Sequence, residues 1–181
     1  KRINDLYEYN GKLYISCDYG VSVLNLSNLE FESTYFIGPA GEEVKVLQTT
    51  VLNDEIYAVT TLYGIRKASL NNPFIYDFSQ WQTFDAGYWF GIVTFNNTIV
   101  AMNTNSKTYR YTGATFVEVL SQAQSGLKIK TNSSEIIVTT KNHIYVVDAI
   151  YSLIAHVTGI PGYSVNFTSA TVVDNQIFIC N

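Results

Sequence analysis

A sequence pattern recurs about every 40 residues along this chain of 181 residues. Each occurrence contains a polar two-residue turn followed by a short apolar run of residue types that favour β-strands. The five occurrences are NGKLYIS (10–16), NDEIYAV (53–59), NNTIVAM (96–102), SSEIIVT (133–139) and DNQIFIC (174–180). Their first apolar residues are separated by 43, 43, 37 and 41 residues. A period of this length strongly constrains the fold, because each repeat has to form one structural unit that packs against the next.

A second strand-like segment precedes each apolar run, so each repeat opens with a β-hairpin. These segments are LYEY (6–9), TVL (50–52), IVTF (92–95), KIKT (128–131) and SATVV (169–173). Asn and Asp dominate the turns between the two strands, and both tolerate the positive φ of tight hairpin turns. Third strands are expected within 18–26, 62–70, 105–112 and 141–148. Fourth strands are expected within 31–38, 81–86, 115–120 and 152–159.

Four antiparallel strands in about 40 residues, repeated along a chain, are typical of β-propeller blades. We therefore predict an all-β fold: a β-propeller fragment with four four-stranded antiparallel blades, the first hairpin of a fifth, and negligible helix. The blades are expected at about residues 1–39, 40–86, 87–122, 123–160 and 161–181, the last one partial. Because a propeller closes as a ring, we expect this single β-propeller segment to be truncated from a larger protein.

Alternation of side chains along the second strand of each hairpin predicts which residues face the neighbouring blades. The predicted residues are Leu13, Ile15, Ile56, Ala58, Ile99, Ala101, Ile136, Val138, Ile177 and Ile179.

The composition and charge of the chain argue against nucleic-acid binding, and its apolar runs are too short for a membrane-spanning helix. Charged residues make up only 14% of the chain, and the formal net charge is −4. No cluster of Lys or Arg is present that could follow a phosphate backbone, so we expect no nucleic-acid partner. No apolar run approaches the roughly 20 residues of a membrane-spanning helix, so we expect no direct membrane span.

Residues that could support catalysis are few and scattered. The only two histidines, His143 and His156, fall in the two outer strands of the fourth repeat, which seldom face the channel where propeller enzymes build their sites. We expect structural roles for both. Cys17 and Cys180 are expected to be small buried residues rather than a disulfide. Motifs of serine nucleophiles, zinc proteases and phosphate loops are absent from the sequence. We therefore predict no catalytic residue, no metal site and no cofactor, in a protein that is not an enzyme.

Two segments carry a resemblance to a known family. The first is INDLYEYNGKLYISCDYGVSVLNLSNLEFESTYFIG (3–38). The second, residues 44–84, contains a link made of Leu70, Asn72-Pro73, Asp77-Phe78-Ser79 and Trp81. Both segments resemble the PorZ-type N-terminal β-propeller of the Bacteroidetes type IX secretion system, whereas the later repeats agree with it only in their general pattern. More distantly, the first repeat is similar to the regulator-propeller repeats of hybrid two-component sensors.

The PorZ resemblance implies a surface-exposed protein of an attachment complex that recognises lipopolysaccharide and helps to fix cargo to the outer membrane. We accordingly predict a non-enzymatic binding or assembly module of a secreted cell-surface protein. Its partners would be proteins of a secretion or attachment complex, or a surface glycan such as lipopolysaccharide. Its location would be extracellular, in the periplasm or at the outer membrane, with a signal peptide expected upstream of this fragment.

Two other functions remain open at this point. One is a periplasmic ligand-sensing propeller of a hybrid two-component regulator. The other is a propeller enzyme, which would need carboxylate, Asn or His side chains on successive innermost strands. Those strands instead carry polar residues of mixed sign and type, namely Asp5, Glu8, Lys45, Gln48, Lys128 and Lys130.

Six aromatic residues are candidates for ligand binding because they fall in loops expected on one face of the disc. They are Tyr19, Tyr63, Tyr88, Trp89, Phe90 and Tyr163. Three consecutive large aromatic side chains, Tyr88-Trp89-Phe90, cannot all point into one core from an extended segment. We expect at least one of them to be exposed on the loop between the second and third blades, with Trp89 as the main contact for a partner. The alternative is that all three pack between those two blades.

Overall fold

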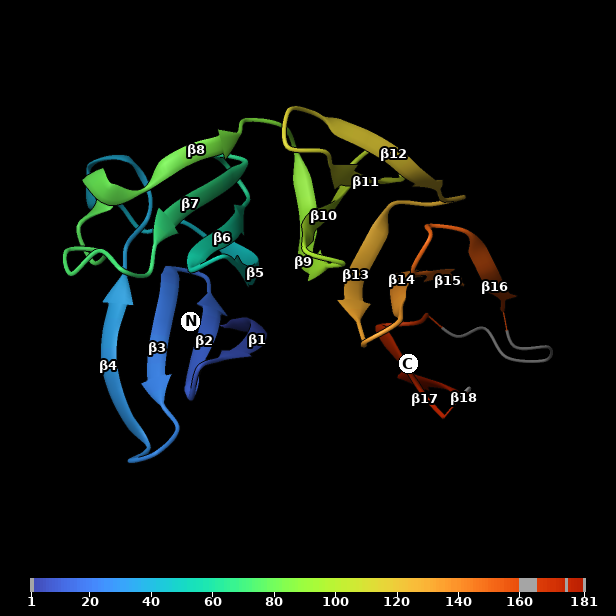
Figure 1. The fold of residues 1–181 in the computed structure, drawn as a ribbon, viewed down its shortest axis with the longest axis horizontal. Coiled ribbons are helices and arrows are strands. Elements are labelled where there is room, and N and C mark those ends of the chain that lie inside the picture. The colour runs from blue at the N-terminus through green and yellow to red at the C-terminus, as the bar shows by residue number, and fades with distance from the viewer. Residues whose placement is uncertain (1, 160–165, 175, 181) are drawn as a thin grey trace. The chain divides into compact units, whose positions relative to one another are not determined.

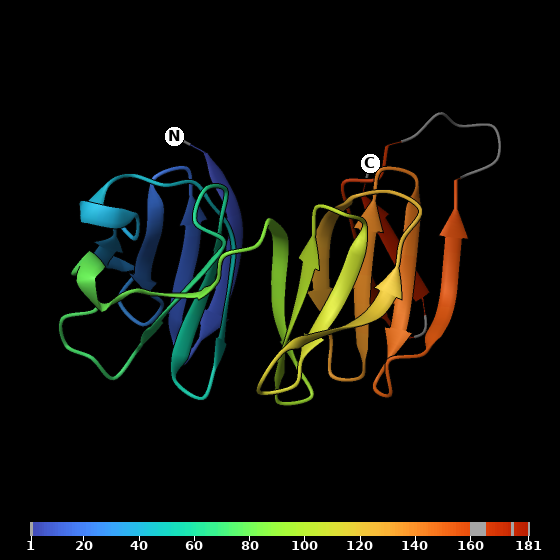
Figure 2. The same ribbon diagram turned by 90° about the horizontal axis from the view of Figure 1, so that it is seen from above.

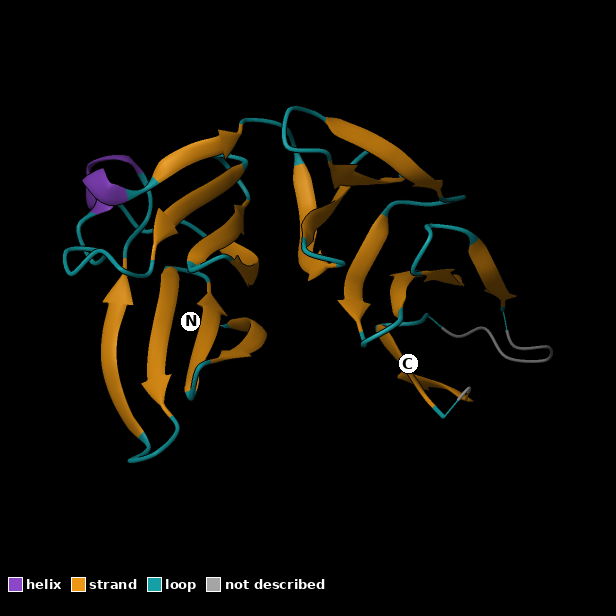
Figure 3. Cartoon of the chain, in the orientation of Figure 1, coloured by secondary structure: helices purple, strands orange, loops and turns teal. Residues whose placement is uncertain are grey.

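The computed structural model describes residues 2–159, 166–174 and 176–180, and these residues form antiparallel β-sheets (Figure 1). Four sheets have four strands each and a further sheet has two, so the predicted all-β propeller architecture is confirmed. Helix among the described residues is limited to two 3-10 turns, η1 (Pro39–Gly41) and η2 (Phe78–Gln80), shown in purple in Figure 3. The same residues include no helix with the length and apolar character that crossing a bilayer requires.

Within each sheet the strands follow one another in sequence order, as Figures 1 and 2 show. The first sheet comprises β1 (Ile3–Tyr9), β2 (Lys12–Cys17), β3 (Gly20–Asn25) and β4 (Glu30–Tyr35). The second comprises β5 (Val46–Leu52), β6 (Glu55–Thr60), β7 (Ile65–Ser69) and β8 (Gln82–Asp85). The third comprises β9 (Trp89–Phe95), β10 (Thr98–Asn103), β11 (Lys107–Tyr111) and β12 (Phe116–Ser121). The fourth comprises β13 (Gly126–Thr131), β14 (Glu135–Thr140), β15 (His143–Asp148) and β16 (Leu153–Thr158), and the last β17 (Ser169–Val173) and β18 (Gln176–Cys180).

The chain divides into two compact units, residues 1–92 and residues 93–181. The first unit contains the first two sheets and the start of β9. The second unit contains the rest of the third sheet, the fourth sheet and the β17–β18 hairpin.

Turn chemistry sets the hairpin register in the first unit as predicted. Asn10 and Gly11 have φ values of 50° and 71°, and Asn53 and Asp54 have φ values of 52° and 57°. Two consecutive residues with positive φ form the type of turn whose twist matches that of the flanking strands. Tyr9 therefore pairs with Lys12, and Leu52 pairs with Glu55.

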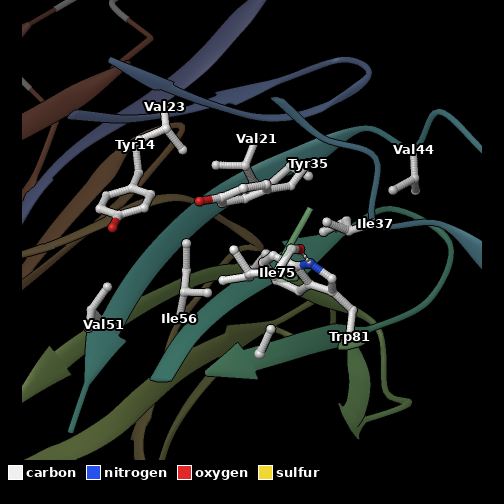
Figure 4. Close-up of a cluster of buried hydrophobic side chains, with 13 residues drawn as sticks. Tyr14, Val21, Val23, Tyr35, Ile37, Val44, Val51, Ile56, Ile75 and Trp81 are labelled. Carbon is white, nitrogen blue, oxygen red and sulfur yellow. Dashed lines mark hydrogen bonds between the residues drawn. The ribbon is translucent and has the colours of Figure 1, made fainter. Parts of the chain in front are cut away.

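The core of the first unit lies between its two sheets and includes Tyr14, Val21, Tyr35, Ile56 and Trp81 (Figure 4). The Tyr35 and Trp81 rings are 6.0 Å apart between centroids. The indole Nε1 of Trp81 donates a 2.9 Å hydrogen bond to the carbonyl oxygen of Ile75. This bond satisfies the polar edge of the indole, so the large ring can be buried without leaving a donor unpaired.

Among the described residues of the second unit, a core lies on each face of the fourth sheet. On one face, Ile136 and Val138 pack with residues of the third sheet such as Met102. On the other face, Ile137 packs with Phe167 and other residues beside β17. The second strand of this sheet is therefore buried on both sides, which explains its continuous apolar sequence.

Most of the predicted core positions are buried. Seven of them are buried, namely Ile15, Ile56, Ala58, Ile99, Ala101, Ile136 and Val138. Leu13, Ile177 and Ile179 are partly buried.

Two sequence-based expectations about local structure are wrong. Cys17 is buried as expected, but Cys180 is exposed, in line with the alternating burial along β18. Both cysteines are free. The innermost strands are also longer than their apolar residues indicated: β9 begins at Trp89, so Trp89 and Phe90 belong to a strand rather than to a loop.

Candidate functional site

Four connecting segments of the first unit meet at one end of its two sheets. They are the β2–β3 turn (18–20), the segment after β4 (36–45), the β6–β7 turn (61–64) and the segment after β8 (86–88), and together we call them the loop face. Three of the six candidate aromatic residues, Tyr19, Tyr63 and Tyr88, lie in these segments.

The β2–β3 turn is linked to the segment after β4. The Tyr19 and Phe36 rings are 6.5 Å apart between centroids, and the Tyr19 hydroxyl lies 3.3 Å from Oγ of Ser22. Asp18, in the same turn, lies 3.9 Å from Nζ of Lys45. Tyr19 is half-buried by these contacts, whereas Phe36 is exposed.

The segment after β4 is linked in turn to the β6–β7 turn. The backbone N–H of Thr61 donates a 3.1 Å hydrogen bond to the carbonyl oxygen of Lys45. The hydroxyl of Tyr63 donates a short hydrogen bond to the carboxylate of Glu42. Leu62 lies between these two contacts in the sequence, and its side chain is 70% exposed.

A Tyr-Gly pair occupies the same position in both turns, and both glycines are required by close backbone packing. A Cβ on Gly20 would lie 2.1 Å from the carbonyl oxygen of Tyr35, at the end of β4. A Cβ on Gly64 would lie 2.1 Å from the carbonyl oxygen of Asp85, at the end of β8. Each turn therefore rests directly on the end of the fourth strand of its blade. This packing holds Tyr19 and Tyr63 in equivalent places.

Asp85 organises the last segment of the loop face. Its Oδ1 accepts a 2.7 Å hydrogen bond from the backbone N–H of Gly87 and a 2.8 Å hydrogen bond from Nε1 of Trp89. These bonds hold the chain between β8 and β9, and Tyr88 projects from that connection with 76% of its surface exposed.

The Tyr88-Trp89-Phe90 group divides as an extended segment requires. Tyr88 and Phe90 are exposed, which confirms that at least one member of the group faces solvent. Trp89 is only 8% exposed, so the expectation that it provides the main exposed contact is wrong. Successive side chains of a strand point to opposite faces, and the indole takes the inward position because Asp85 can satisfy its N–H there.

The charges of the loop face are fixed by hydrogen bonds. Asp18 accepts a 3.2 Å hydrogen bond from Nδ2 of Asn4 and a 3.3 Å hydrogen bond from the backbone N–H of Arg2. The Asn4 bond, the Arg2 bond and the charge of Lys45 hold the pKa of Asp18 below its ordinary value. The hydrogen bond to Glu42 raises the pKa of the Tyr63 hydroxyl. At neutral pH the face therefore presents an ionised Asp18 and a protonated Tyr63 hydroxyl.

The remaining sequence candidates are not brought to this face. Tyr163 lies outside the described residues. His143 and His156 lie in β15 and β16 of the second unit, where their ring nitrogens Nδ1 and Nε2 are 3.0 Å apart. Sequence reasoning placed both histidines in one blade but did not foresee that they meet. In the described part of the chain, no group of three or more His, Cys, Asp or Glu side chains is arranged to hold a metal ion.

Phe36 and Leu62 are two further exposed residues of the loop face that sequence reasoning did not select as binding candidates. Both fall inside segments in which strands are expected, 31–38 and 62–70. The sequence did offer a signal for both: a large apolar side chain lies next to a Tyr at the end of a strand or in a turn, where it need not belong to the core.

Comparisons with known proteins agree with this fold. Residues 1–82 match the family model of the PorZ N-terminal β-propeller domain of the type IX secretion system. A search of curated proteins gave no significant match. Among solved structures, PorZ of Porphyromonas gingivalis, described as an essential bacterial surface component of that system, aligns with a TM-score of 0.78 and 14% identity, over 99% of this chain and 23% of PorZ.

Two further structures are similar in fold. The extracellular domain of the putative one-component system BT4673 from B. thetaiotaomicron aligns with a TM-score of 0.70 and 15% identity, over 99% of this chain and 25% of that chain. The computationally designed protein Ika8 aligns with a TM-score of 0.68 and 10% identity, over 99% of this chain and 55% of that chain. The chain thus spans about a quarter of PorZ and of the BT4673 domain. It has the fold of a β-propeller segment, and its first 82 residues match the PorZ N-terminal β-propeller family.

Proposed function

We propose that this chain is a non-enzymatic binding and assembly module of a bacterial cell-surface protein, with a role in type IX secretion like that of PorZ. The observation that carries the proposal is the PorZ family match over residues 1–82. That range contains both Tyr-Gly turns and most of the loop face. The part of the chain that resembles a secretion component is therefore also the part that builds the candidate binding surface.

The loop face has the properties of a binding surface. Its turns rest on strand ends through Gly20 and Gly64, so the exposed groups are held in place before a partner arrives. Tyr88, Leu62 and Phe36 supply exposed apolar area. Aromatic side chains of this kind dominate the energetics of many protein interfaces, because they bury a large area at a small loss of conformational freedom.

The proposed partner is a protein of the attachment complex or the glycan of a surface lipopolysaccharide. Both present flat surfaces with many hydroxyl or amide groups, which tyrosine can contact through its ring and through its hydroxyl. On the same face, the ionised carboxylate of Asp18 adds hydrogen-bond acceptors, and the neighbouring Lys45 adds a positive charge.

Binding can be measured by biolayer interferometry, with the purified chain immobilised. Purified lipopolysaccharide and detergent-solubilised outer-membrane proteins of a type IX-competent bacterium are passed over it separately. The variants Tyr88→Ala and Phe36→Ala should weaken binding at least about tenfold, because truncating a central interface aromatic costs roughly 2 kcal/mol. Phe31→Ala is the matched control: Phe31 is an exposed aromatic near the opposite end of β4. Equal binding by all three variants would exclude the loop face, and no binding of either preparation would exclude the proposed partners.

A periplasmic ligand-sensing propeller of a hybrid two-component regulator is the second candidate function. It is favoured by the similarity in fold to the extracellular domain of the BT4673 system. The coding sequence that surrounds this segment distinguishes the two functions. A C-terminal sorting domain supports the secretion role, whereas a transmembrane helix followed by a kinase supports the sensor.

The proposed location is the cell surface, the periplasm or the outer membrane. Immunoblots of intact cells treated with proteinase K test this. Digestion of the protein in intact cells supports the cell surface. Protection that is lost when the outer membrane is opened supports the periplasm.

A further inference from the structure

The two histidines of the chain form a pair on the fourth sheet. His143 begins β15, and His156 lies in the adjacent strand β16. His156 pairs directly with Tyr145, while His143 pairs with Thr158, so the two histidines are diagonal neighbours across the strands. Nδ1 of His143 lies 3.0 Å from Nε2 of His156.

The ring of a buried tyrosine, Tyr145, stacks against both imidazoles. The Tyr145 ring stacks on His156 with 4.3 Å between centroids and 13° between planes. It also stacks on His143, with 5.9 Å between centroids. Tyr145 is itself fixed, because it packs in the core of the second unit and its hydroxyl accepts a 2.9 Å hydrogen bond from the backbone N–H of Ala123. Both imidazoles therefore rest on a rigid base, while His156 remains open to solvent.

The distance between the two nitrogens matches that between two ligands of one metal ion. Imidazole nitrogens bind zinc at about 2.0–2.1 Å. Two such nitrogens on one ion stand about 3 Å apart, close to the 3.0 Å observed here. Binding of an ion would require the two imidazoles, whose facing nitrogens are now hydrogen-bonded to each other, to rotate so that both lone pairs point at the ion.

Protonation is compatible with chelation. A neutral imidazole has one N–H and one nitrogen with a free lone pair. In the hydrogen-bonded pair, one of the facing nitrogens carries the hydrogen. When an ion binds, that hydrogen moves to the far nitrogen of the same ring, Nε2 of His143 or Nδ1 of His156. Both facing nitrogens are then ligands, and the hydrogen stays on the same imidazole.

We propose that His143 and His156 form a two-histidine chelating site for a divalent transition-metal ion, with water completing the coordination. Imidazole ligands favour copper, nickel and zinc, and the general order of affinity places Cu²⁺ above Ni²⁺ and Zn²⁺. The site is not expected to bind Mg²⁺ or Ca²⁺, because these ions prefer oxygen donors. Chelation would tie the edge strand β16 to β15 through two side chains.

Calorimetric titration of the tag-free protein, stripped with EDTA, tests the proposal with CuCl₂, NiCl₂ and ZnCl₂, and with MgCl₂ as the negative probe. The expected result is one transition-metal ion per chain. His143→Ala and His156→Ala should each weaken binding at least about tenfold, a loss of about 1.4 kcal/mol. Thr158→Ala is the matched control, since Thr158 is exposed, pairs with His143 and has no ligating nitrogen. This variant should bind as the wild type does.

Several outcomes of these experiments would overturn the proposal. If the two histidines bound ions independently, each single variant would keep one ion at unchanged affinity. If the double variant bound as well as the wild type, the ion would be held elsewhere. Should either variant fail to fold by circular dichroism, nuclear magnetic resonance of the wild type decides. Chelation requires the imidazole signals of both histidines to shift together and to saturate at one Zn²⁺ per chain; a shift of one ring alone contradicts it.

Discussion

Nε1 of Trp89, the first residue of β9, donates a 2.8 Å hydrogen bond to Oδ1 of Asp85, the last residue of β8. The same carboxylate oxygen accepts from the backbone N–H of Gly87. One side chain thus organises the whole connection between these strands and holds the indole inward. The aromatic residue best suited to binding by its type is consequently used for stability.

Trp89→Ala should therefore lower stability rather than binding. Removal of a buried Trp side chain costs about 3–5 kcal/mol, measured as the loss in the free energy of unfolding in urea. Trp89→Phe keeps a buried ring and loses the hydrogen bond, so it should cost less than Trp89→Ala. Binding of the surviving folded protein to the partners of the loop face should be unchanged. An unaltered unfolding midpoint with weakened binding would contradict this assignment.

Gly64→Ala should be markedly more destabilising than Gly11→Ala. Both glycines have similar positive φ values, 63° and 71°, so both variants carry the cost of an L-residue in that region, roughly 1–2 kcal/mol. Only Gly64 has a backbone oxygen at 2.1 Å from the added Cβ, whereas Gly11 has nothing within 4 Å. Chemical unfolding of the two variants isolates the effect of crowding. Equal losses would show that the β6–β7 turn can move away from β8.

The repeat predicted the fold because it depends on local rules. Polar turn residues such as Asn53 and Asp54 determine hairpin register, and the apolar runs that follow them form buried strands. These signals recur in every blade and need no knowledge of distant contacts. The strand limits were less accurate at β5 and β9, because the apolar runs assigned to the hairpins left out the first residues of these strands, Val46-Leu47 and Trp89-Phe90.

The candidate site was predicted less well than the fold. Whether a side chain is exposed depends on which other residues it contacts, and the sequence alone does not identify these contacts. Three adjacent aromatic residues could be assigned to opposite faces, but choosing Trp89 for the core required knowing that Asp85 accepts its N–H. The meeting of His143 and His156 likewise required the pairing of β15 with β16 in a specific register. A shift of one residue would have put the two rings on opposite faces of the sheet.

Asp18 should contribute to stability in a pH-dependent manner. Its pKa in the folded protein is lowered by the hydrogen bonds from Asn4 and Arg2 and by Lys45. A lowered folded pKa means that the contribution is present above the unfolded value, about 3.9, and is lost as the pH falls through the folded pKa. Asp18→Asn should therefore be less stable than the wild type at pH 7, and the difference should shrink towards pH 2. A difference that is constant with pH would show that the charge of Asp18 is not responsible.

Phe167 should determine whether the β17–β18 hairpin stays attached to the fourth sheet. Its side chain is fully buried and packs with Ile137, Ile144 and Val146, and its backbone N–H donates a 2.8 Å hydrogen bond to the carbonyl oxygen of Lys141. Phe167→Ala should cost about 3–5 kcal/mol, concentrated where the hairpin meets the fourth sheet.

Hydrogen exchange followed by mass spectrometry shows where that loss falls. Amides of β17 and β18 should lose protection in Phe167→Ala, while those of β10 in the third sheet should keep theirs. Phe178→Ala is the matched control, because Phe178 is in the same hairpin but 53% exposed, and most surface substitutions change stability by only about 0.5 kcal/mol. If both variants lost protection equally, packing of the hairpin would not depend on the buried ring. If neither did, the hairpin would be held mainly by its backbone contacts, such as the bond from Phe167 to Lys141.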